Sequence, residues 1–336
     1  MNTSGIAAAG NWIIDHVKII DNYPQQEALS NILEERFGNG GSPYNILKNL
    51  AKLGANFPLH AVGLVGDDML GKKIIQDCKE NKIHTANLLT TSEAPTSYTD
   101  VMTVKNTGKR TFFHNRGANA FLDDTHIDFD KIDAKIFHLG YLLLLDKIDA
   151  ILADGETLAA KLLKKASESG FETSIDIVSE ASDRFKKIVP ASLPYTDYLF
   201  INEYEASQLT GITIPEDISS YTDTLQKVGE SILQMGVRKY VFLHSIYGVL
   251  CWDKQGNYIF QPALKIPAEK VVGSAGAGDA LASGIMYGLH ENLPLRESLL
   301  LGVSTAASCL FHPTCSGGIL SKVEVLELGT EFGFIS

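Results

Sequence analysis

Residues 271–284, with the sequence VVGSAGAGDALASG, contain three glycines and other small residues directly before a single aspartate. Gly276, Ala277 and Gly278 lack bulky side chains, so a ligand can approach their backbone amides closely. A helix that opens at Asp279 would add unpaired N–H groups and the positive end of its dipole, which together form an anion site. Asp279 would then accept a proton from an attacking hydroxyl group. The stretch predicts phosphoryl transfer with a carboxylate as general base.

A dinucleotide site or an ordinary turn would account for this stretch less well. A dinucleotide-binding fingerprint needs G-x-G-x-x-G after the first strand, but here the third position is Leu281 and the stretch lies near the C-terminus. An ordinary strand-to-helix turn explains the glycines but not the acid directly after them. A second run, GDDMLGKK at residues 66–73, matches the G-x-x-x-x-G-K part of a P-loop. It has Lys73, however, at the next position, where a P-loop needs serine or threonine to bind Mg²⁺. We interpret that run as a turn that caps the next helix.

The elements that must position these residues alternate between strands and helices. Short apolar runs typical of buried strands, such as GIAAAG at 5–10, alternate with helical runs such as ETLAAKLLKKASESG at 156–170. This alternation predicts an α/β fold with a mostly parallel central sheet and helices on both faces. Two hairpin-like insertions, at about 16–38 and 97–117, interrupt it, and we expect them to form a small β-sheet lid. The whole chain, 1–336, is predicted to be a single domain.

Composition excludes several classes of protein. The formal net charge of −11 would repel nucleic acids and anionic membrane surfaces. The four cysteines form no C-x-x-C pair and no zinc-like spacing with histidine, so we expect reduced thiols. The N-terminal segment lacks the regions of a signal peptide, and no apolar run is long enough to cross a bilayer. We therefore expect a soluble, cytoplasmic protein with no nucleic-acid or membrane partner.

Other catalytic patterns are absent from the sequence. It contains no H-E-x-x-H zinc motif and no G-x-S-x-G nucleophile motif. His114 and His138 lie in apolar, strand-like surroundings, so we expect both to be packed in the interior rather than catalytic.

Several motifs, in order along the chain, resemble those of the PfkB, or ribokinase-like, carbohydrate kinases. Residues 273–284 resemble the family's C-terminal signature, D-T-x-G-A-G-D followed by a helix. GGSPYNILKNLAKLGA, at 40–55, resembles its N-terminal signature. LFINEYEASQLTG, at 199–211, matches its N-x-x-E segment, and RGANAFL, at 116–122, its G-A-N segment. The resemblance covers nearly the whole chain and implies a ribokinase-like fold and a carbohydrate kinase that uses ATP and Mg²⁺.

The resemblance also implies a role for individual residues on the phosphate side of the site. Asp279 would be the catalytic base, and the amides of residues 276–278 would form the anion hole. Asn202 and Glu205 would hold the Mg²⁺ and phosphate region through water, without direct metal ligands. Without the other motifs, these two residues equally fit a capping box at the start of a helix.

On the acceptor side, the resemblance implies that Asp15, Gly40, Gly41 and Asn45 border the substrate pocket. A carboxylate and an amide suit a polyol, because together they accept and donate several hydrogen bonds. Taken alone, Asp15 also fits a surface acid in a lid strand, and Asn45 fits a helix cap.

Two departures from the family pattern affect the expected cofactors. Gly273 and Ser274 replace the usual D-T, whose aspartate commonly helps to bind a monovalent cation, so potassium activation is not implied. The nucleotide segment, usually T-x-G-x-x-G, is LHSIYG at 243–248, which leaves Ser245 and Gly248 at the ATP-binding positions. The threonine and the first glycine of that segment are therefore lost.

These observations predict an ATP-dependent kinase that phosphorylates a hydroxyl group of a sugar or small polyol. One alternative is a nucleoside kinase of the same fold, in which Tyr98, Phe112 and Phe113 of the lid stack on a base. Another is a sugar-binding regulatory protein that kept the fold and lost catalysis. Because exposed strand edges need protection, and related lids often pair, we also expect a homodimer formed through the lid.

Overall fold

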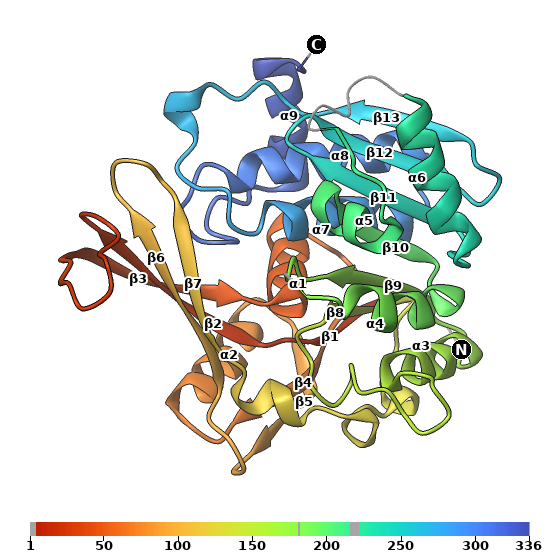
Figure 1. Ribbon diagram of the computed structural model, residues 1–336, viewed down its shortest axis with the longest axis horizontal. Helices are drawn as coiled ribbons and strands as arrows, with labels where there is room; N and C mark the ends of the chain where they lie inside the picture. The colour runs from red at the N-terminus through yellow and green to blue at the C-terminus, as the bar shows by residue number, and fades with distance from the viewer. Residues whose placement is uncertain (1–4, 181, 216–221, 336) are drawn as a thin grey trace.

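The computed structural model of the chain describes residues 5–180, 182–215 and 222–335. Residues 1–4, part of the segment in which no signal peptide is expected, lie outside the described residues. The described chain forms a large sheet flanked by helices and a smaller sheet that projects from one side (Figure 1). Among the helices of the described ranges, none combines the length and apolar composition that crossing a membrane requires.

The large sheet has nine strands in the order β13-β12-β11-β10-β9-β8-β1-β4-β5. The strands are β1 (Ile6–Gly10), β4 (Leu59–Gly66), β5 (His84–Thr91), β8 (Ile136–Leu142), β9 (Glu172–Ile177), β10 (Tyr198–Asn202), β11 (Tyr240–Ser245), β12 (Gly248–Asp253) and β13 (Tyr258–Pro262). All pairs from β5 to β11 are parallel, and β12 and β13 add an antiparallel edge. The predicted mostly parallel sheet is confirmed.

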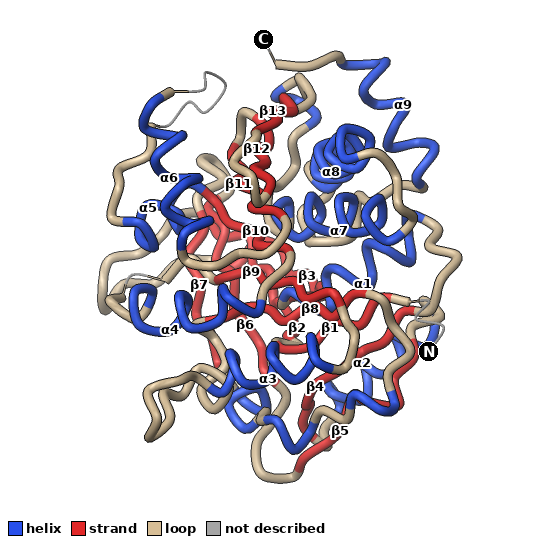
Figure 2. The backbone as a smooth tube through the Cα atoms, turned by 90° about the vertical axis from the view of Figure 1, so that its right-hand side faces the viewer, coloured by secondary structure: helices blue, strands red, loops and turns tan. Residues whose placement is uncertain are grey.

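Helices cover both faces of this sheet, as Figure 2 shows edge-on. The core on one face contains side chains of α3 (Leu158–Glu168), α4 (Phe185–Ser192), α5 (Glu203–Thr210) and α6 (Asp223–Gln234). The core on the other face contains side chains of α1 (Ser42–Leu53), α2 (Met69–Glu80), α7 (Ala277–His290), α8 (Leu295–Cys309) and α9 (Lys322–Phe332). Consecutive residues of β1 alternate between the two cores, which explains why this strand is apolar throughout rather than alternating with polar residues.

The smaller sheet is the predicted β-sheet beside the main domain. It has the strand order β3-β2-β6-β7, formed by β2 (Ile13–Ile20), β3 (Ile32–Gly40), β6 (Ser97–Val104) and β7 (Arg110–Asn115). β2 and β6 pair in parallel, and the outer pairs are antiparallel. The register aligns Asp15 with Thr99, and Thr99 with His114. Because side chains alternate between the faces of a strand, these three residues share one face of the lid.

Candidate active site

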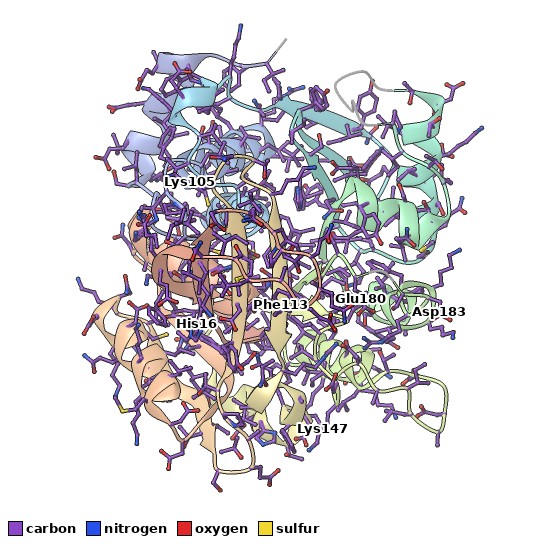
Figure 3. All side chains as sticks on the ribbon, turned by 60° about the vertical axis from the view of Figure 1, so that its left-hand side comes forward. His16, Lys105, Phe113, Lys147, Glu180 and Asp183 are labelled. Carbon is purple, nitrogen blue, oxygen red and sulfur yellow. The ribbon has the colours of Figure 1, made fainter. Side chains whose placement is uncertain are left out.

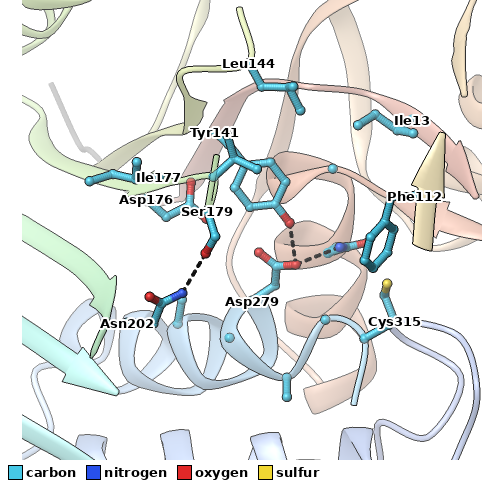
Figure 4. A pocket seen from close by; sticks show the side chains of 18 of the residues that line it. Ile13, Phe112, Tyr141, Leu144, Asp176, Ile177, Ser179, Asn202, Asp279 and Cys315 are labelled. Atoms are coloured by element: carbon cyan, nitrogen blue, oxygen red, sulfur yellow. Dashed lines mark hydrogen bonds between the residues drawn. The ribbon is translucent and has the colours of Figure 1, made fainter. Parts of the chain in front are cut away.

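A cavity of about 610 Å³ lies where the lid meets the carboxyl ends of the central strands and the start of α7 (Figure 4). Parallel strands end at the same edge of a sheet, which is where open α/β sheets bind ligands. The lid contributes Asp15, Thr99, Arg110, Phe112 and His114, and the strand ends contribute Tyr141, Asp176, Ser179, Asn202 and His244. The segment before α7 and the first turn of this helix contribute residues 274–279. Asp15, Asn45, Gly276, Ala277, Gly278 and Asp279, predicted from separate motifs, line this one cavity.

The start of α7 has the backbone of an anion site. The helix begins at Ala277, two residues before the expected start, so Asp279 lies in its first turn. The earlier start puts the amides of the glycine-rich stretch inside the helix end, where the dipole is strongest. Gly276 precedes the helix with a φ of 77°, and no side chain caps the helix there. A Cβ at Gly276 would come within 2.6 Å of Cys315 Cβ, so this position requires glycine.

Asp279 is 6% exposed and is held by two hydrogen bonds, both drawn in Figure 4. Its Oδ2 accepts from Asn45 Nδ2 at 2.7 Å and from the Tyr141 hydroxyl at 2.8 Å. Burial raises the pKa of Asp279 above its ordinary value, and the negative charges of Asp176 and Asp15 add to that increase. The two hydrogen bonds act in the opposite direction because they stabilise the carboxylate. A basic carboxyl group beside an anion site suits removal of a hydroxyl proton.

The acceptor-side residues surround Asp15. Burial raises the pKa of Asp15 to about 7, and the Cys315 thiol and the Arg110 charge oppose that increase. The thiol of Cys315 donates to Asp15 Oδ2 at 3.7 Å. Gly41 lines the cavity, whereas Gly40 is absent from the described lining. Gly40 instead leaves room for the acid, because a Cβ there would lie 2.3 Å from Asp15 Oδ1.

Asn202 and Glu205 form the capping box that was one of the two interpretations of the sequence, and they also lie at the cavity. They form a capping box at the start of α5, in which Asn202 Oδ1 accepts from the Glu205 amide at 2.8 Å and Glu205 Oε2 accepts from the Asn202 amide at 2.9 Å. Both residues also line the cavity. Glu205 is 4% exposed, and burial raises its pKa to about 7. A cap of this kind keeps a buried carboxylate rigidly at the cavity wall.

The oxygen atoms near this cap fit a hydrated Mg²⁺ ion. Asp176 lies near Glu205 at the end of β9, and its Oδ2 accepts from Ser42 Oγ at 2.6 Å. Its Oδ1 is buried and has no hydrogen-bond partner within the described part of the chain. Carboxylate and amide oxygens suit Mg²⁺, which keeps several of its waters. Within that same part, no group of three or more acidic, histidine or cysteine side chains is placed to hold a metal ion.

A second cavity, of about 430 Å³, lies on the other side of the α7 start. Ser245 and Gly248, the predicted ATP-binding positions, line it together with Tyr204 and apolar residues of α7 and α8. Both cavities share Asn202, His244, Ser274, Ala277 and Gly278. The apolar walls suit a nucleobase, and the shared helix end suits the phosphates that would connect the two cavities. Although the 243–248 segment lacks the usual threonine and first glycine, it still lines a cavity.

His244 is one of several lining residues that the sequence did not single out. Burial lowers the pKa of His244 to about 4, so its ring is neutral beside the anion site. Tyr141, Asp176, Arg110 and Cys315 also line the cavity. They lie in four separate segments without a recognisable motif, and only Tyr141 and Asp176 shared a detectable signal, a position at the end of an apolar strand.

Of the two histidines expected to be packed in the interior, one instead lines the cavity. His138 is buried and packed as expected, with its ring nitrogens bonded to the hydroxyl groups of Ser42 and Ser174. His114, however, lines the cavity, where its Nδ1 lies 2.9 Å from Thr99 Oγ1, because β7 turns this position toward the pocket.

The three lid aromatics do not form one stacking surface. Phe112 lines the cavity, and Tyr98 and Phe113 are absent from its described lining. The register aligns Phe113 with Asp100, and Asp100 with His16. The Tyr98 ring stacks on the ring of His16, with the two ring centres 5.4 Å apart. Tyr98 and Phe113 therefore lie on the face of the lid opposite the cavity.

Comparison with protein families gives a match over nearly the whole chain. The model described as "pfkB family carbohydrate kinase" matches residues 5–321. The curated relatives include the probable chloroplastic fructokinase-6 of Arabidopsis thaliana, which is 26% identical over 91% of this chain and 76% of its own. The 5-dehydro-2-deoxygluconokinase of Geobacillus thermodenitrificans is 23% identical over 85% of this chain and 82% of its own.

Solved structures share the architecture. The ribokinase of Arabidopsis thaliana complexed with ribose and ATP superposes with a TM-score of 0.79 and 21% identity, over 97% of this chain and 98% of that one. The ribokinase of Giardia lamblia has a TM-score of 0.82 and 18% identity, over 98% and 99% of the two chains. These similarities confirm the predicted ribokinase-like fold.

Proposed function

Because the chain belongs to the pfkB family of carbohydrate kinases, we propose that it transfers the terminal phosphoryl group of ATP to a hydroxyl group of a sugar or small polyol. The observation that carries this proposal is the meeting of two cavities at the start of α7. An acceptor in the first cavity and a nucleotide in the second would both contact residues 277–278. Asp279 follows these residues directly and faces the acceptor side.

In the proposed mechanism, Asp279 accepts the proton of the attacking hydroxyl group as the phosphoryl group is transferred. Asn45 and Tyr141 hold its Oδ2, which orients the other oxygen of the carboxylate toward the cavity. The amides at the start of α7 would stabilise the negative charge on the transferring group. Asp15 would accept hydrogen bonds from the acceptor, whose position under the lid excludes water.

The residues near Asn202 would keep the phosphates and the metal in place. Asp176, Asn202 and Glu205 would hold Mg²⁺ through its water molecules, and bound Mg²⁺ would neutralise phosphate charge. His244 remains uncharged because of its lowered pKa, so it would shape the wall between the cavities without forming an ion pair. With Gly273 in place of the usual aspartate, we expect the reaction to proceed without potassium.

The alternatives have less support. A nucleoside acceptor would be stacked by Phe112 alone of the three lid aromatics. A regulatory protein without catalysis would not need a buried carboxyl group, destabilised by two nearby acids, at the mouth of an anion site. The names of the relatives favour a sugar or sugar acid, since they include fructokinase, ribokinase and 5-dehydro-2-deoxygluconokinase.

A substrate panel tests the proposal. ADP release would be measured with MgATP and fructose, ribose, other hexoses and pentoses, 5-dehydro-2-deoxygluconate and purine nucleosides. We expect a sugar or sugar acid to give turnover that depends on acceptor concentration. Turnover restricted to nucleosides, or tight sugar binding without turnover for every acceptor, would contradict it and favour one of the two alternatives.

A further inference from the structure

A third cavity, of about 240 Å³, opens from the acceptor cavity under the lid. The residues that line both cavities are Asp15, Arg110, Phe112, Ser274, Ala275 and Cys315. The rest of the described lining comes from the lid strands β2 and β6, the tip of the lid hairpin, residues 271–273 and residues 313–314. Asp279 is absent from this lining, so the third cavity extends away from the catalytic base. The proposed reaction gives this cavity no role.

The inner face of the lid is polar above the acceptor cavity and apolar farther out. One row across three strands, above the acceptor cavity, consists of Asp15, Thr99 and His114. Two residues farther along the strands, the next row on the same face consists of Val17, Val101 and Phe112. Because a strand rises about 3.3 Å per residue, this apolar row lies about 7 Å beyond Asp15. An acceptor whose hydroxyl groups contact Asp15 therefore has apolar side chains at its far end.

The remaining wall of the third cavity is also apolar. It contains Val271, Val272 and Pro313. Gly273, which replaces the aspartate of the family pattern, lies in the same wall and leaves it without that charge. Within the described lining of the third cavity, Asp15 and Arg110 are the charged residues, and both lie where it meets the acceptor cavity. Beyond that junction the cavity presents no charge to a ligand.

Three apolar side chains in this cavity are exposed to solvent although they line a single space. Phe112 is 58% exposed, Val271 43% and Val272 59%. They come from two separate segments, the lid strand β7 and the segment before α7. A hydrogen bond from Arg110 Nη2 to Ser274 Oγ, at 2.9 Å, joins these two segments. An apolar group bound between them would remove this surface from water, which is favourable.

We propose that the third cavity binds an apolar substituent of the acceptor, so that the substrate is a sugar or polyol with an alkyl or aryl group at the end remote from the reacting hydroxyl group. Asp15 would accept hydrogen bonds from the sugar at the junction of the two cavities, and the apolar walls would cover the substituent. An apolar cavity of about 150 Å³ can hold benzene, so a cavity of about 240 Å³ has room for a phenyl group. The identity of the substrate rests on the proposed function, whereas the binding of an apolar group does not.

A nucleobase fits the same cavity less well than an alkyl or aryl group. A base that is buried needs hydrogen-bond partners for its donors and acceptors. Beyond the residues shared with the acceptor cavity, the polar side chains in the described lining are Thr103 and Thr314. The hydroxyl group of Thr314 is already engaged, because it lies 2.9 Å from His312 Nδ1.

Pairs of acceptors that differ in one substituent test the proposal. ADP release with MgATP would be measured for the methyl and phenyl glycosides of ribose and of fructose, in both anomers, and their binding would be measured by titration calorimetry. We expect a phenyl glycoside to have a KM and a dissociation constant at least tenfold below those of its methyl counterpart. Burial of roughly 60 Å² of additional apolar surface is sufficient for a change of that size.

A substitution in the apolar wall tests where the phenyl group binds. Val272→Asp places a charge in the third cavity at an exposed position, so the unfolding temperature should not fall. We expect it to weaken binding of the phenyl glycoside at least fivefold and to leave the methyl glycoside unaffected, because Val272 is absent from the described lining of the acceptor cavity. The control is Val323→Asp, which changes a similarly exposed valine of α9 outside the cavities and should retain the preference of the parent.

The outcomes separate this inference from the proposed reaction. Turnover of free sugars together with equal or weaker binding of the phenyl glycosides would overturn the role of the third cavity and leave the reaction standing. A phenyl preference that persists in Val272→Asp, or tighter binding of adenosine than of phenyl riboside, would also overturn it. A phenyl preference in calorimetry without turnover of any acceptor would support the cavity and contradict the reaction.

Discussion

At the scale of single residues, the properties of Asp279 come from groups that are distant in the sequence. Asn45 and Tyr141 donate hydrogen bonds to one of its oxygens. The negative charges of Asp176 and Asp15 raise its pKa by repelling the carboxylate. The resulting carboxyl group is a stronger base than an exposed aspartate, because its charged form is less stable. It also needs a higher pH than an exposed aspartate to be in its active, deprotonated form.

Replacing Asp279 by asparagine tests the general base directly. We expect Asp279→Asn to lower kcat by about 10²–10⁴-fold, because a positioned base typically contributes that much. Titration calorimetry should still show acceptor and nucleotide binding, and the unfolding temperature should not fall, because a buried charge is replaced by a neutral group. The control is Asp67→Asn, an exposed acid outside the cavities. Near-parental kcat in the Asp279 variant would refute the assignment.

Replacing Tyr141 by phenylalanine tests the pKa of that base. The Tyr141 hydroxyl stabilises the carboxylate and so lowers the pKa of Asp279. Without it the pKa rises further, and the base becomes protonated at a higher pH. In a profile of kcat/KM against pH, we expect the acidic limb of Tyr141→Phe to move to higher pH, with activity recovered under alkaline conditions. Tyr23→Phe, on the exposed surface, serves as control. A uniform loss at every pH would indicate that Tyr141 acts in some other way.

At the scale of elements, the lid contacts the segment before α7 through Arg110 at the start of β7. Its Nη2 donates to Ser274 Oγ at 2.9 Å, two residues before Gly276. Arg110 is also the one lysine or arginine in the described lining of the acceptor cavity. The lid thus brings a positive charge close to Asp15 and to the start of α7.

Replacing Arg110 by methionine should weaken lid closure. We expect Arg110→Met to raise the acceptor KM about three- to tenfold, since one hydrogen bond from a charged group is lost at a partly exposed position. Hydrolysis of ATP without acceptor should rise relative to transfer, because a less closed lid admits water. Lys109→Met removes a neighbouring lid charge that is absent from the described lining and should leave both rates unchanged. Identical kinetics of the two variants would show that Arg110 does not control closure.

At the scale of the whole molecule, the lid presents apolar side chains to solvent. Leu33 and Phe37 of β3 and Phe113 of β7 are each at least half exposed, at 50%, 54% and 51%. Figure 3 labels His16 and Phe113, which the strand register assigns to the lid face opposite the acceptor cavity. Exposed apolar side chains beside the open strand edges of β3 and β7 favour the predicted pairing of two lids.

The homodimer predicted through the lid can be tested by mass. Light scattering after size exclusion should give about twice the chain mass of 36.6 kDa. A Leu33→Lys/Phe113→Lys variant should elute as a monomer, because charges replace the apolar contact. Val323→Lys, on an exposed position of α9, should leave the dimer intact. A monomeric parent protein, or a dimer that survives the lid substitutions, would rule out this interface.

Local patterns were sufficient to predict the fold class and several of the residues that line the first cavity. The G-A-G-D stretch and the N-x-x-E cap act through backbone geometry within a few residues, so their structure follows from the local sequence. The alternation of buried strands with helices likewise predicts a parallel sheet, because each element has its own hydrophobic period. Only the start of α7, two residues earlier than expected, needed correction at this level.

The tertiary structure decided which side chains meet. Tyr141 lies 138 positions from Asp279 in the chain, and Asn45 lies 234 positions away, so only the strand order brings them into contact. In the lid, too, the sequence alone does not determine which side chains face the cavity, because a shift of one residue along a strand moves a side chain to the opposite face. That alternation turned His114 and Phe112 into the cavity and left Phe113 outside it. Sequence patterns determined the elements, and the register and packing of those elements determined the site.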